Sequence, residues 1–223
     1  MESDLTGAVF LEFYGLPGSG KSTVSHLVAE KLRSEGKTVL EPTYNVDHKY
    51  LGIIRKVIKL LNMVRYSLVH PKKYKDIVRL VKSNGYGGTR SVLFQVANVT
   101  LKLWVYDRGV AEYVIFDEGL TQSAIALAQK GKLSSIENEK QLYSLCKKRS
   151  VEKIYIVVAD RESINRLSER DNHDSRIEKI QSIGEREKAL RFFKEQCELI
   201  SGNRVDGSQS QHRVMGFVIT LLR

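Results

Sequence analysis

The stretch AVFLEFYGLPGSGKSTVSHLVAEKL, residues 8–32, constrains the fold more than any other part of the chain. The apolar, β-branched run Ala8–Tyr14 predicts a buried strand, and the amphipathic pattern of Lys21–Ser34 predicts a helix. A tight turn joins them, and the residues that it brings together are Gly15, Leu16, Pro17, Gly18, Ser19, Gly20, Lys21, Ser22 and Thr23. A strand that passes through such a turn into a helix is typical of parallel sheets covered by helices.

The turn has the spacing G-x-x-x-x-G-K-[ST] of a phosphate-binding loop. Its glycines permit positive φ, so that successive amides point inward at phosphate oxygens, and the start of the helix adds unpaired amides and its dipole. We expect Lys21 to reach the β- and γ-phosphates of ATP and the Ser22 hydroxyl to bind Mg²⁺. ATP and Mg²⁺ are therefore the expected cofactors.

The rest of the chain alternates between strand and helix patterns. Four more runs predict strands, at Thr38–Leu40, Tyr113–Phe116, Lys153–Ala159 and near Arg204–Val205. The expected helices after the first are Leu51–Leu68, Tyr74–Val81, Ser91–Trp104, Gln122–Lys130, Glu137–Lys147, Glu162–Arg170 and Arg176–Ile200. This order predicts the α/β class: a three-layer P-loop NTPase fold with a five-stranded, mostly parallel sheet and helices on both faces. We expect one domain over residues 1–223.

Composition limits the choice of partners. The net charge of +10 admits nucleic acid or an anionic membrane surface, although handling polyphosphates also requires positive potential. Cys146 and Cys197 match no metal or redox spacing and are expected to be reduced thiols. The acidic N-terminus does not have the pattern of a signal peptide, and the C-terminal run VMGFVITLL is too short to cross a bilayer. We expect a cytoplasmic protein whose partners are ATP and a small molecule rather than nucleic acid.

Two acids follow the apolar run at Tyr113–Phe116. Asp117 is placed to hold Mg²⁺ directly or through water, and Glu118 is the candidate base for a hydroxyl acceptor. The alternative is a solvated acid pair at a strand-to-helix turn, with Asp117 as the helix cap. The nearby sequence YDRGV, residues 106–110, is interpreted as the turn that leads into this strand.

An arginine-bearing segment follows the predicted strand Lys153–Ala159. Arg166 and Arg170 are spaced i, i+4 on one helical face, and Arg176 follows a polar turn. Arginines that close over a nucleotide neutralise the transferring phosphoryl group and exclude water. The alternative is a helix with ordinary Arg–Glu surface pairs.

The order of these motifs resembles the P-loop kinases of the nucleoside-monophosphate kinase group, most of all thymidylate kinase. Besides the loop, the chain has LEPTY at 40–44, TRSVLFQVAN at 89–98, RLSERDNHDSRIE at 166–178 and RVDGSQSQHRV at 204–214. The resemblance implies an acceptor-binding helical region at about 48–105 and a lid at about 161–178. It also implies that two copies pair through helices.

The resemblance further implies roles for single residues. Arg166 or Arg170 stabilises the transferring group or lies on the adenine, and Asp206, Gly207 and Ser208 border the base. Glu41 and Arg90 line the acceptor site.

Two departures from that family lie on the acceptor side. Asp117-Glu118 stands where the family has Asp-Arg, and Val99 stands where it has an arginine. Both remove positive charge, which favours an acceptor hydroxyl on a sugar, nucleoside or other metabolite over an acceptor phosphate. We therefore predict an ATP-dependent small-molecule kinase. A thymidylate-kinase-like monophosphate kinase is one alternative, and a P-loop ATPase or switch that acts on a macromolecule is another.

Overall fold

The computed structural model describes residues 7–49, 52–109, 111–147, 150–168, 180 and 182–222. In chain order the elements are β1 (Val9–Gly15), α1 (Lys21–Ser34), β2 (Val39–Leu40), α2 (Pro42–Lys49), α3 (Gly52–Val69), α4 (Pro71–Ser83), α5 (Thr89–Arg108), β3 (Tyr113–Phe116), α6 (Leu120–Ala128), α7 (Ser135–Ser144), β4 (Val151–Val157), α8 (Asp160–Ser168), α9 (Ile183–Leu199), β5 (Asn203–Asp206) and α10 (Gln211–Leu221).

The five strands form one sheet in the order β2-β3-β1-β4-β5, and every pairing in it is parallel. β1 is central, with Phe10 opposite Val114 of β3 and Tyr14 opposite Tyr155 of β4. Because parallel strands end at the same edge, the loops after β1, β3, β4 and β5 meet there. The predicted α/β class and the five-stranded sheet are confirmed.

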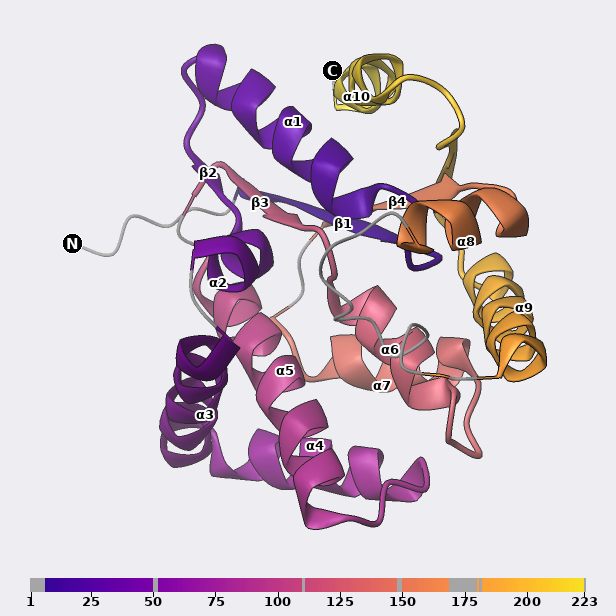
Figure 1. Ribbon diagram of the computed structural model, residues 1–223. Coiled ribbons are helices and arrows are strands. Elements are labelled where there is room, and N and C mark those ends of the chain that lie inside the picture. The colour runs from indigo at the N-terminus through magenta and orange to yellow at the C-terminus, as the bar shows by residue number, and fades with distance from the viewer. Residues whose placement is uncertain are drawn as a thin grey trace.

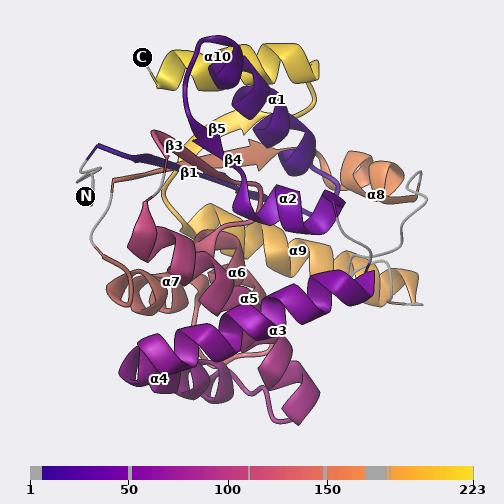
Figure 2. The same ribbon diagram turned by 90° about the vertical axis from the view of Figure 1, so that its left-hand side faces the viewer.

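Helices cover both faces of this sheet, as Figures 1 and 2 show. α1 and α10 lie on one face, and α5, α6, α7 and α9 lie on the other, with α3 and α4 farther out. Successive side chains of β1 alternate between the faces: Leu11 and Phe13 pack in the cluster with α1 and α10, whereas Phe10 packs in the cluster with α5 and α6. A strand buried on both sides is apolar throughout, which is why β1 is evident in the sequence.

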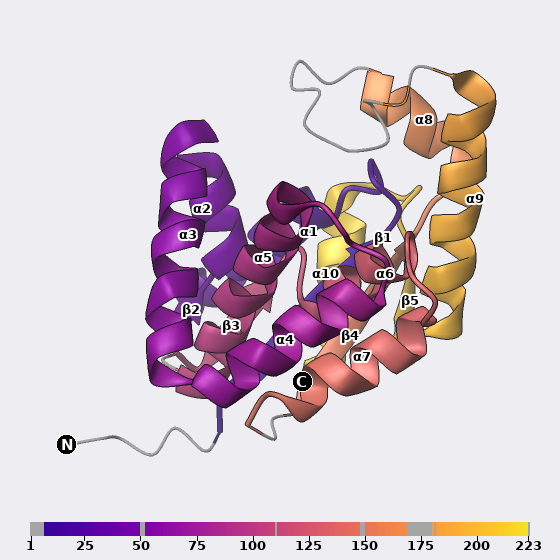
Figure 3. The same ribbon diagram turned by 90° about the horizontal axis from the view of Figure 1, so that it is seen from below.

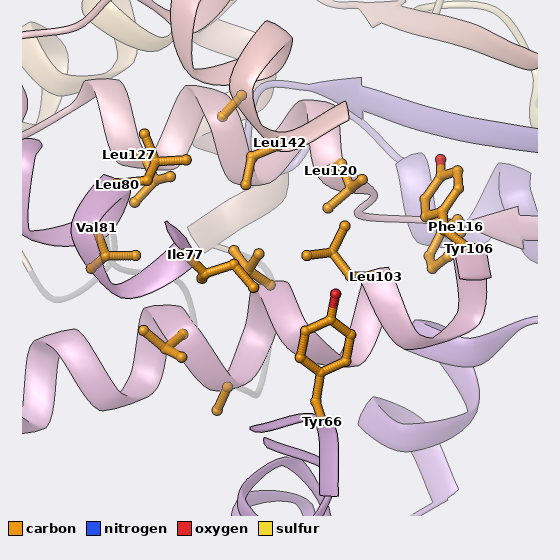
Figure 4. Packing of buried hydrophobic residues seen from close by; sticks show 14 of the residues in the cluster. Tyr66, Ile77, Leu80, Val81, Leu103, Tyr106, Phe116, Leu120, Leu127 and Leu142 are labelled. Atoms are coloured by element: carbon orange, nitrogen blue, oxygen red, sulfur yellow. The ribbon is translucent and has the colours of Figure 1, made fainter. Parts of the chain in front are cut away.

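The larger cluster ties the outer helices to the sheet (Figure 4). Ile77 and Leu80 of α4 and Leu103 of α5 are buried in it with Leu120 and Leu127 of α6. Figure 3, seen from below, shows α4 and α7 on this side of the molecule. The packing fixes α5 and α6, whose first turns approach the edge where the strands end.

The structure corrects the interpretation of YDRGV as a turn. Tyr106, Asp107 and Arg108 form the last turn of α5, and the helix ends at Gly109, whose φ of 54° is left-handed. The Tyr106 ring stacks between Phe10 and Phe116, with ring centroids 4.7 and 5.2 Å apart. The sequence pattern ends the helix too early, because Tyr106 has a polar hydroxyl and was not recognised as a core residue.

Other boundaries shift by a few residues, and one helix is unexpected. β4 covers Val151–Val157 rather than Lys153–Ala159, and α2 follows β2 directly within the LEPTY segment. The apolar C-terminal run forms α10, which buries Val214 and Val218 against the α1 side of the sheet. Across the described ranges, we find no helix with both the length and the apolar character that a bilayer span requires.

Candidate active site

The loop after β1 has the conformation that its glycines predict. Gly15, Gly18 and Gly20 all have positive φ, of 146°, 84° and 90°. A Cβ on Gly15 would lie 2.6 Å from the Ile156 carbonyl oxygen, and one on Gly18 would lie 2.6 Å from the carbonyl oxygen of Ser163. Only glycine fits at these two positions, because both the backbone angles and the neighbouring main chain exclude a side chain.

Lys21 begins α1 and folds back over the loop. Its Nζ donates to the carbonyl oxygens of Gly15, at 3.2 Å, and Leu16, at 2.9 Å, and the side chain is buried. The Ser19 hydroxyl is also buried, and among the described atoms it has no hydrogen-bond partner. A buried hydroxyl without a partner beside a lysine and a helix start is a site that phosphate oxygens would satisfy. Pro17 and Gly20 are partly exposed in the same loop, and Thr23 is exposed on α1.

Asp117 directly follows β3, and its carboxylate accepts hydrogen bonds from two hydroxyls. The Ser22 Oγ donates to Asp117 Oδ2 at 2.8 Å, and Thr43 Oγ1 donates to Oδ1. Asp117 is 5% exposed. Carboxylate and hydroxyl oxygens suit Mg²⁺, so this set of donors fits the expected metal. No described group of three or more His, Cys, Asp or Glu side chains forms a metal site.

Thr43 is a member of this site that was not predicted from the sequence. It lies in the first turn of α2, where Pro42 occupies the first helical position and the threonine is 74 residues from Asp117. The signal was present in LEPTY, since proline favours a helix start.

A second missed residue supports the turn after Asp117. Glu12 lies within β1 and is fully buried, and its carboxylate accepts from the amides of Leu120, at 2.7 Å, and Thr121, at 2.8 Å. The Tyr106 hydroxyl donates to the same carboxylate at 2.5 Å. A carboxylate on the first amides of α6 satisfies unpaired donors and interacts favourably with the helix dipole.

Lys102 of α5 also contacts the turn between β3 and α6. Its Nζ donates to the Gly119 carbonyl oxygen at 3.0 Å and to Ser123 Oγ at 2.7 Å. Burial lowers the pKa of this ammonium, while the nearby carboxylates of Glu118 and Glu12 raise it. Glu118 itself is exposed, so the chain presents a buried cation and an outward carboxylate at the end of β3.

Gln122 links α6 to the phosphate-binding loop. Its Oε1 accepts from the Gly15 amide at 3.2 Å, and its Nε2 donates to the Gly15 carbonyl oxygen at 3.4 Å. The first glycine of the loop is thus tied to the helix that Glu12 caps.

Arg166 of α8 lies between the loop and the turn after β5. Its guanidinium donates to the carbonyl oxygens of Gly207, at 3.0 Å, and Ser19, at 3.5 Å, and it also pairs with Glu162. Asp206 holds that turn by accepting from the Ser208 hydroxyl at 2.6 Å and the Ser208 amide at 2.9 Å. These two hydrogen bonds, that of the hydroxyl above all, lower the pKa of Asp206. The structure therefore brings Arg166 together with Asp206, Gly207 and Ser208, next to the loop.

Glu41 and Arg90, both expected at the acceptor site, have different surroundings. Glu41 is buried, and its carboxylate pairs with Arg33 at 2.7 Å and His26 at 3.0 Å, both on α1. Arg90 is exposed in the first turn of α5, beside a hollow of about 560 Å³ that Phe94 and Lys130 also line. Val99 is buried in the core cluster. Arg170 and Arg176 lie outside the described residues.

No protein-family model matches the sequence, and no curated protein does. The fold is similar to solved structures of deoxyadenosine kinase from M. mycoides. The structure with bound dATP is 17% identical, with a TM-score of 0.55 over 96% of this chain and 98% of that chain. The structure with the products dCMP and a flexible dCDP is 16% identical, with a TM-score of 0.53 over 96% of this chain and 97% of that one. The structure with bound dCTP is 17% identical, with a TM-score of 0.52 and coverage of 96% and 98%. At such identity the likeness shows the fold alone, a three-layer α/β fold with a parallel five-stranded sheet.

Proposed function

We propose that this protein is an ATP-dependent kinase that transfers the γ-phosphoryl group to a hydroxyl of a small acceptor, a nucleoside above all. The observation that carries the proposal is the contact of Ser22 Oγ with Asp117, 2.8 Å long, directly beneath a glycine loop that encloses Lys21. Ends of two adjacent parallel strands thus supply a phosphate-binding loop and a metal-binding pair. The proposal treats residues 1–223 as one kinase domain that acts in the cytoplasm.

In this proposal each side chain has a limited task. Gly15, Gly18 and Gly20 present amides to the phosphates, while Lys21 neutralises the β- and γ-phosphates as charge moves toward the leaving group. Ser22 and Asp117 would hold Mg²⁺, which when bound would supply positive charge to offset the negative charge of the phosphates.

Arg166 has the role of bordering the adenine together with Asp206, Gly207 and Ser208. The contacts of Arg166 with the Ser19 and Gly207 carbonyl oxygens support this role rather than one at the transferring phosphoryl group. Arg170, within the lid of residues 161–178, is the candidate for the transferring group.

The acceptor side rests on charge. Glu118 is exposed next to Asp117 and is the proposed base, which takes the proton of the attacking hydroxyl. An acceptor phosphate would be repelled by two adjacent acids, and the position of the missing arginine, Val99, is 0% exposed in the core. Residues 48–105, with Glu41 and Arg90, form the proposed acceptor-binding region. The names of the similar structures, all deoxyadenosine kinases, favour a nucleoside among the hydroxyl acceptors.

The test is ADP formation by the purified protein with Mg²⁺ and ATP against a panel of nucleosides, sugars and nucleoside monophosphates. We expect turnover above the rate with water only for hydroxyl acceptors, and none with Lys21→Ala. A monophosphate as the best acceptor would support the thymidylate-kinase-like alternative. ADP formation that responds to no small acceptor but to a macromolecule would support the ATPase alternative. Pairing of two copies stays a prediction, which sedimentation equilibrium of the full chain tests.

A further inference from the structure

The helix α3 has a long apolar face that no described part of the chain covers. Ile53, Leu61 and Leu68 are 77%, 63% and 77% exposed. Ile54, Val57, Leu60 and Val64 are each exposed by two fifths or more of their surface. At about 100° per residue these seven side chains fall within an arc of about 120°, so they form one continuous stripe along the helix. Figure 2 shows α3 in front of α5 and α4, at the outside of the molecule.

The opposite face of α3 explains why the helix is in place. Met63 and Tyr66 are buried in the core cluster with α4 and α5. The stripe therefore belongs to a helix that is already packed, and it does not represent a core that failed to form. Contiguous apolar surface of this kind on a folded chain marks an interaction surface.

Cations border the stripe on both sides. On the helix, exposed Lys56 lies just before one edge of the arc and exposed Arg65 just beyond the other. The surrounding sequence adds to this charge, because residues 48–75 include eight Lys and Arg side chains and no Asp or Glu. That excess of +8 is most of the net charge of +10 that the whole chain has.

These charges decide between possible occupants. A second copy in a twofold dimer would set the same face against itself, with positive charge on both sides and no carboxylate in residues 48–75 to balance it. Nucleic acid supplies negative charge but no apolar layer for seven exposed aliphatic side chains. An anionic bilayer surface supplies both, since phosphates lie directly above the acyl chains.

We propose that the outer face of α3 docks on an anionic membrane surface. The stripe enters the boundary between headgroups and acyl chains, and Lys56 and Arg65 contact the lipid phosphates. α3 lies in the plane of the surface with the core of the protein above it. This inference does not depend on the proposed kinase activity.

Vesicle sedimentation with the full chain tests the proposal. We expect binding to vesicles of phosphatidylcholine with phosphatidylglycerol, weakened by salt, and no binding to phosphatidylcholine alone. Leu61→Asn with Leu68→Asn should weaken binding at least about tenfold, because two exposed leucines no longer enter the bilayer. Leu199→Asn is the matched control, since Leu199 is 49% exposed on α9, and Figure 3 shows α9 on the other side of the molecule from α3.

The charge has its own pair of variants. Lys56→Gln should weaken vesicle binding about fivefold. Lys31→Gln, an exposed lysine on α1 that pairs with Glu35 at 3.2 Å, should have no effect. Trp104, the only tryptophan, has the Arg65 guanidinium 4.5 Å from its ring centre, so its emission should change when vesicles bind.

Three results would overturn the proposal. The first is the absence of binding to anionic vesicles, with the wild type folded by circular dichroism. The second is equal binding by the Leu61/Leu68 double variant, which would mean that the stripe takes no part. The third is a dimer, by sedimentation equilibrium, that the double variant converts to a monomer, which would assign the face to a second copy. None of these results would alter the outcome of the ADP assay.

Discussion

At the scale of single residues, Glu12 projects from the middle of β1, and its buried carboxylate accepts hydrogen bonds from the first amides of α6. The amides of Leu120 and Thr121 donate to different oxygens of this carboxylate, at 2.7 and 2.8 Å. A Cβ on Gly119 would lie 2.3 Å from Glu12 Oε1, so the turn after Glu118 closes directly over this group. The position of the acids at the end of β3 therefore depends on a residue 105 or more positions earlier in the chain.

We expect Glu12→Gln to lower the free energy of unfolding by about 1–3 kcal/mol. The amide side chain has one acceptor oxygen in place of two, so one backbone amide at the start of α6 would face a donor. Urea unfolding followed by circular dichroism measures the change. The control is Glu30→Gln, at an exposed glutamate on α1, which should change the value by less than about 0.5 kcal/mol. Equal stability of the Glu12 variant and the wild type would contradict the importance of this carboxylate.

Ser22→Ala removes one of the two groups proposed to hold Mg²⁺. The phosphate-binding loop should still form, since the Lys21 contacts are to backbone carbonyl oxygens. We expect the Mg²⁺ concentration that gives half-maximal activity to rise about tenfold or more. Ser34→Ala, at the exposed end of the same helix, is the control. An unchanged Mg²⁺ dependence would place the metal elsewhere.

At the scale of elements, α7 begins with a capping box in which the carboxylate of Glu137 has a lowered pKa. The Ser134 amide and hydroxyl both donate to Glu137 Oε2 at 2.8 Å, and the backbone hydrogen bond contributes most to lowering the pKa of Glu137 below its ordinary 4.5. Unfolding raises this pKa, so the unfolded chain binds more protons in this range. The stabilisation is therefore present above pH 4.5 and is lost as the pH falls through the lowered folded-state value.

Glu137→Gln should accordingly flatten the decrease in stability below pH 4.5. Thermal unfolding of the wild type and the variant between neutral and acidic pH measures this difference. The control is Glu187→Gln, at an exposed glutamate on α9, which should leave the pH dependence parallel to that of the wild type. A Glu137 variant whose curve also stays parallel would show that the cap does not titrate with folding.

The sequence predicts those elements best whose signals are local. β1, its loop and α1 follow from one continuous apolar run, three glycines and a lysine, and the structure has them within a residue of the prediction. The end of α5 was not predicted, because only the fold shows that Tyr106 fills a core position between rings of β1 and β3. α2 was not predicted, because Glu41 and Thr43 are polar, and their partners on α1 and just after β3 are distant in the sequence.

The candidate site divides in the same way. Ser22 and Asp117 were predicted from their places after two strands, and they are in contact. Thr43, Glu12 and Gln122 were not predicted, since each contacts a residue 74 or more positions away along the chain. A pattern within one segment does not indicate pairs of this kind. The roles of Glu41 and Arg90 at an acceptor site stay predictions.

At the scale of the whole molecule, charge and chemistry are separated. The loop after β1, Asp117 after β3 and Arg166 of α8 come together at the edge where the parallel strands end, since Asp117 accepts from Ser22 and Arg166 donates to Ser19. Most described residues of the basic segment 48–75 lie instead in α3 and at the start of α4, and α3 lies at the outside of the molecule (Figure 2). The net charge of +10 is thus explained mainly by a surface, while the proposed catalytic cations are few.

The proposed reaction moves the γ-phosphoryl group of ATP to a hydroxyl, and ³¹P nuclear magnetic resonance of the products identifies the group that receives it. With the best acceptor of the panel, we expect the signal of a phosphate monoester to appear in equal amount with ADP. Lys21→Ala should give neither product. Inorganic phosphate alone, or a phosphate anhydride in place of the monoester, would contradict transfer to a hydroxyl.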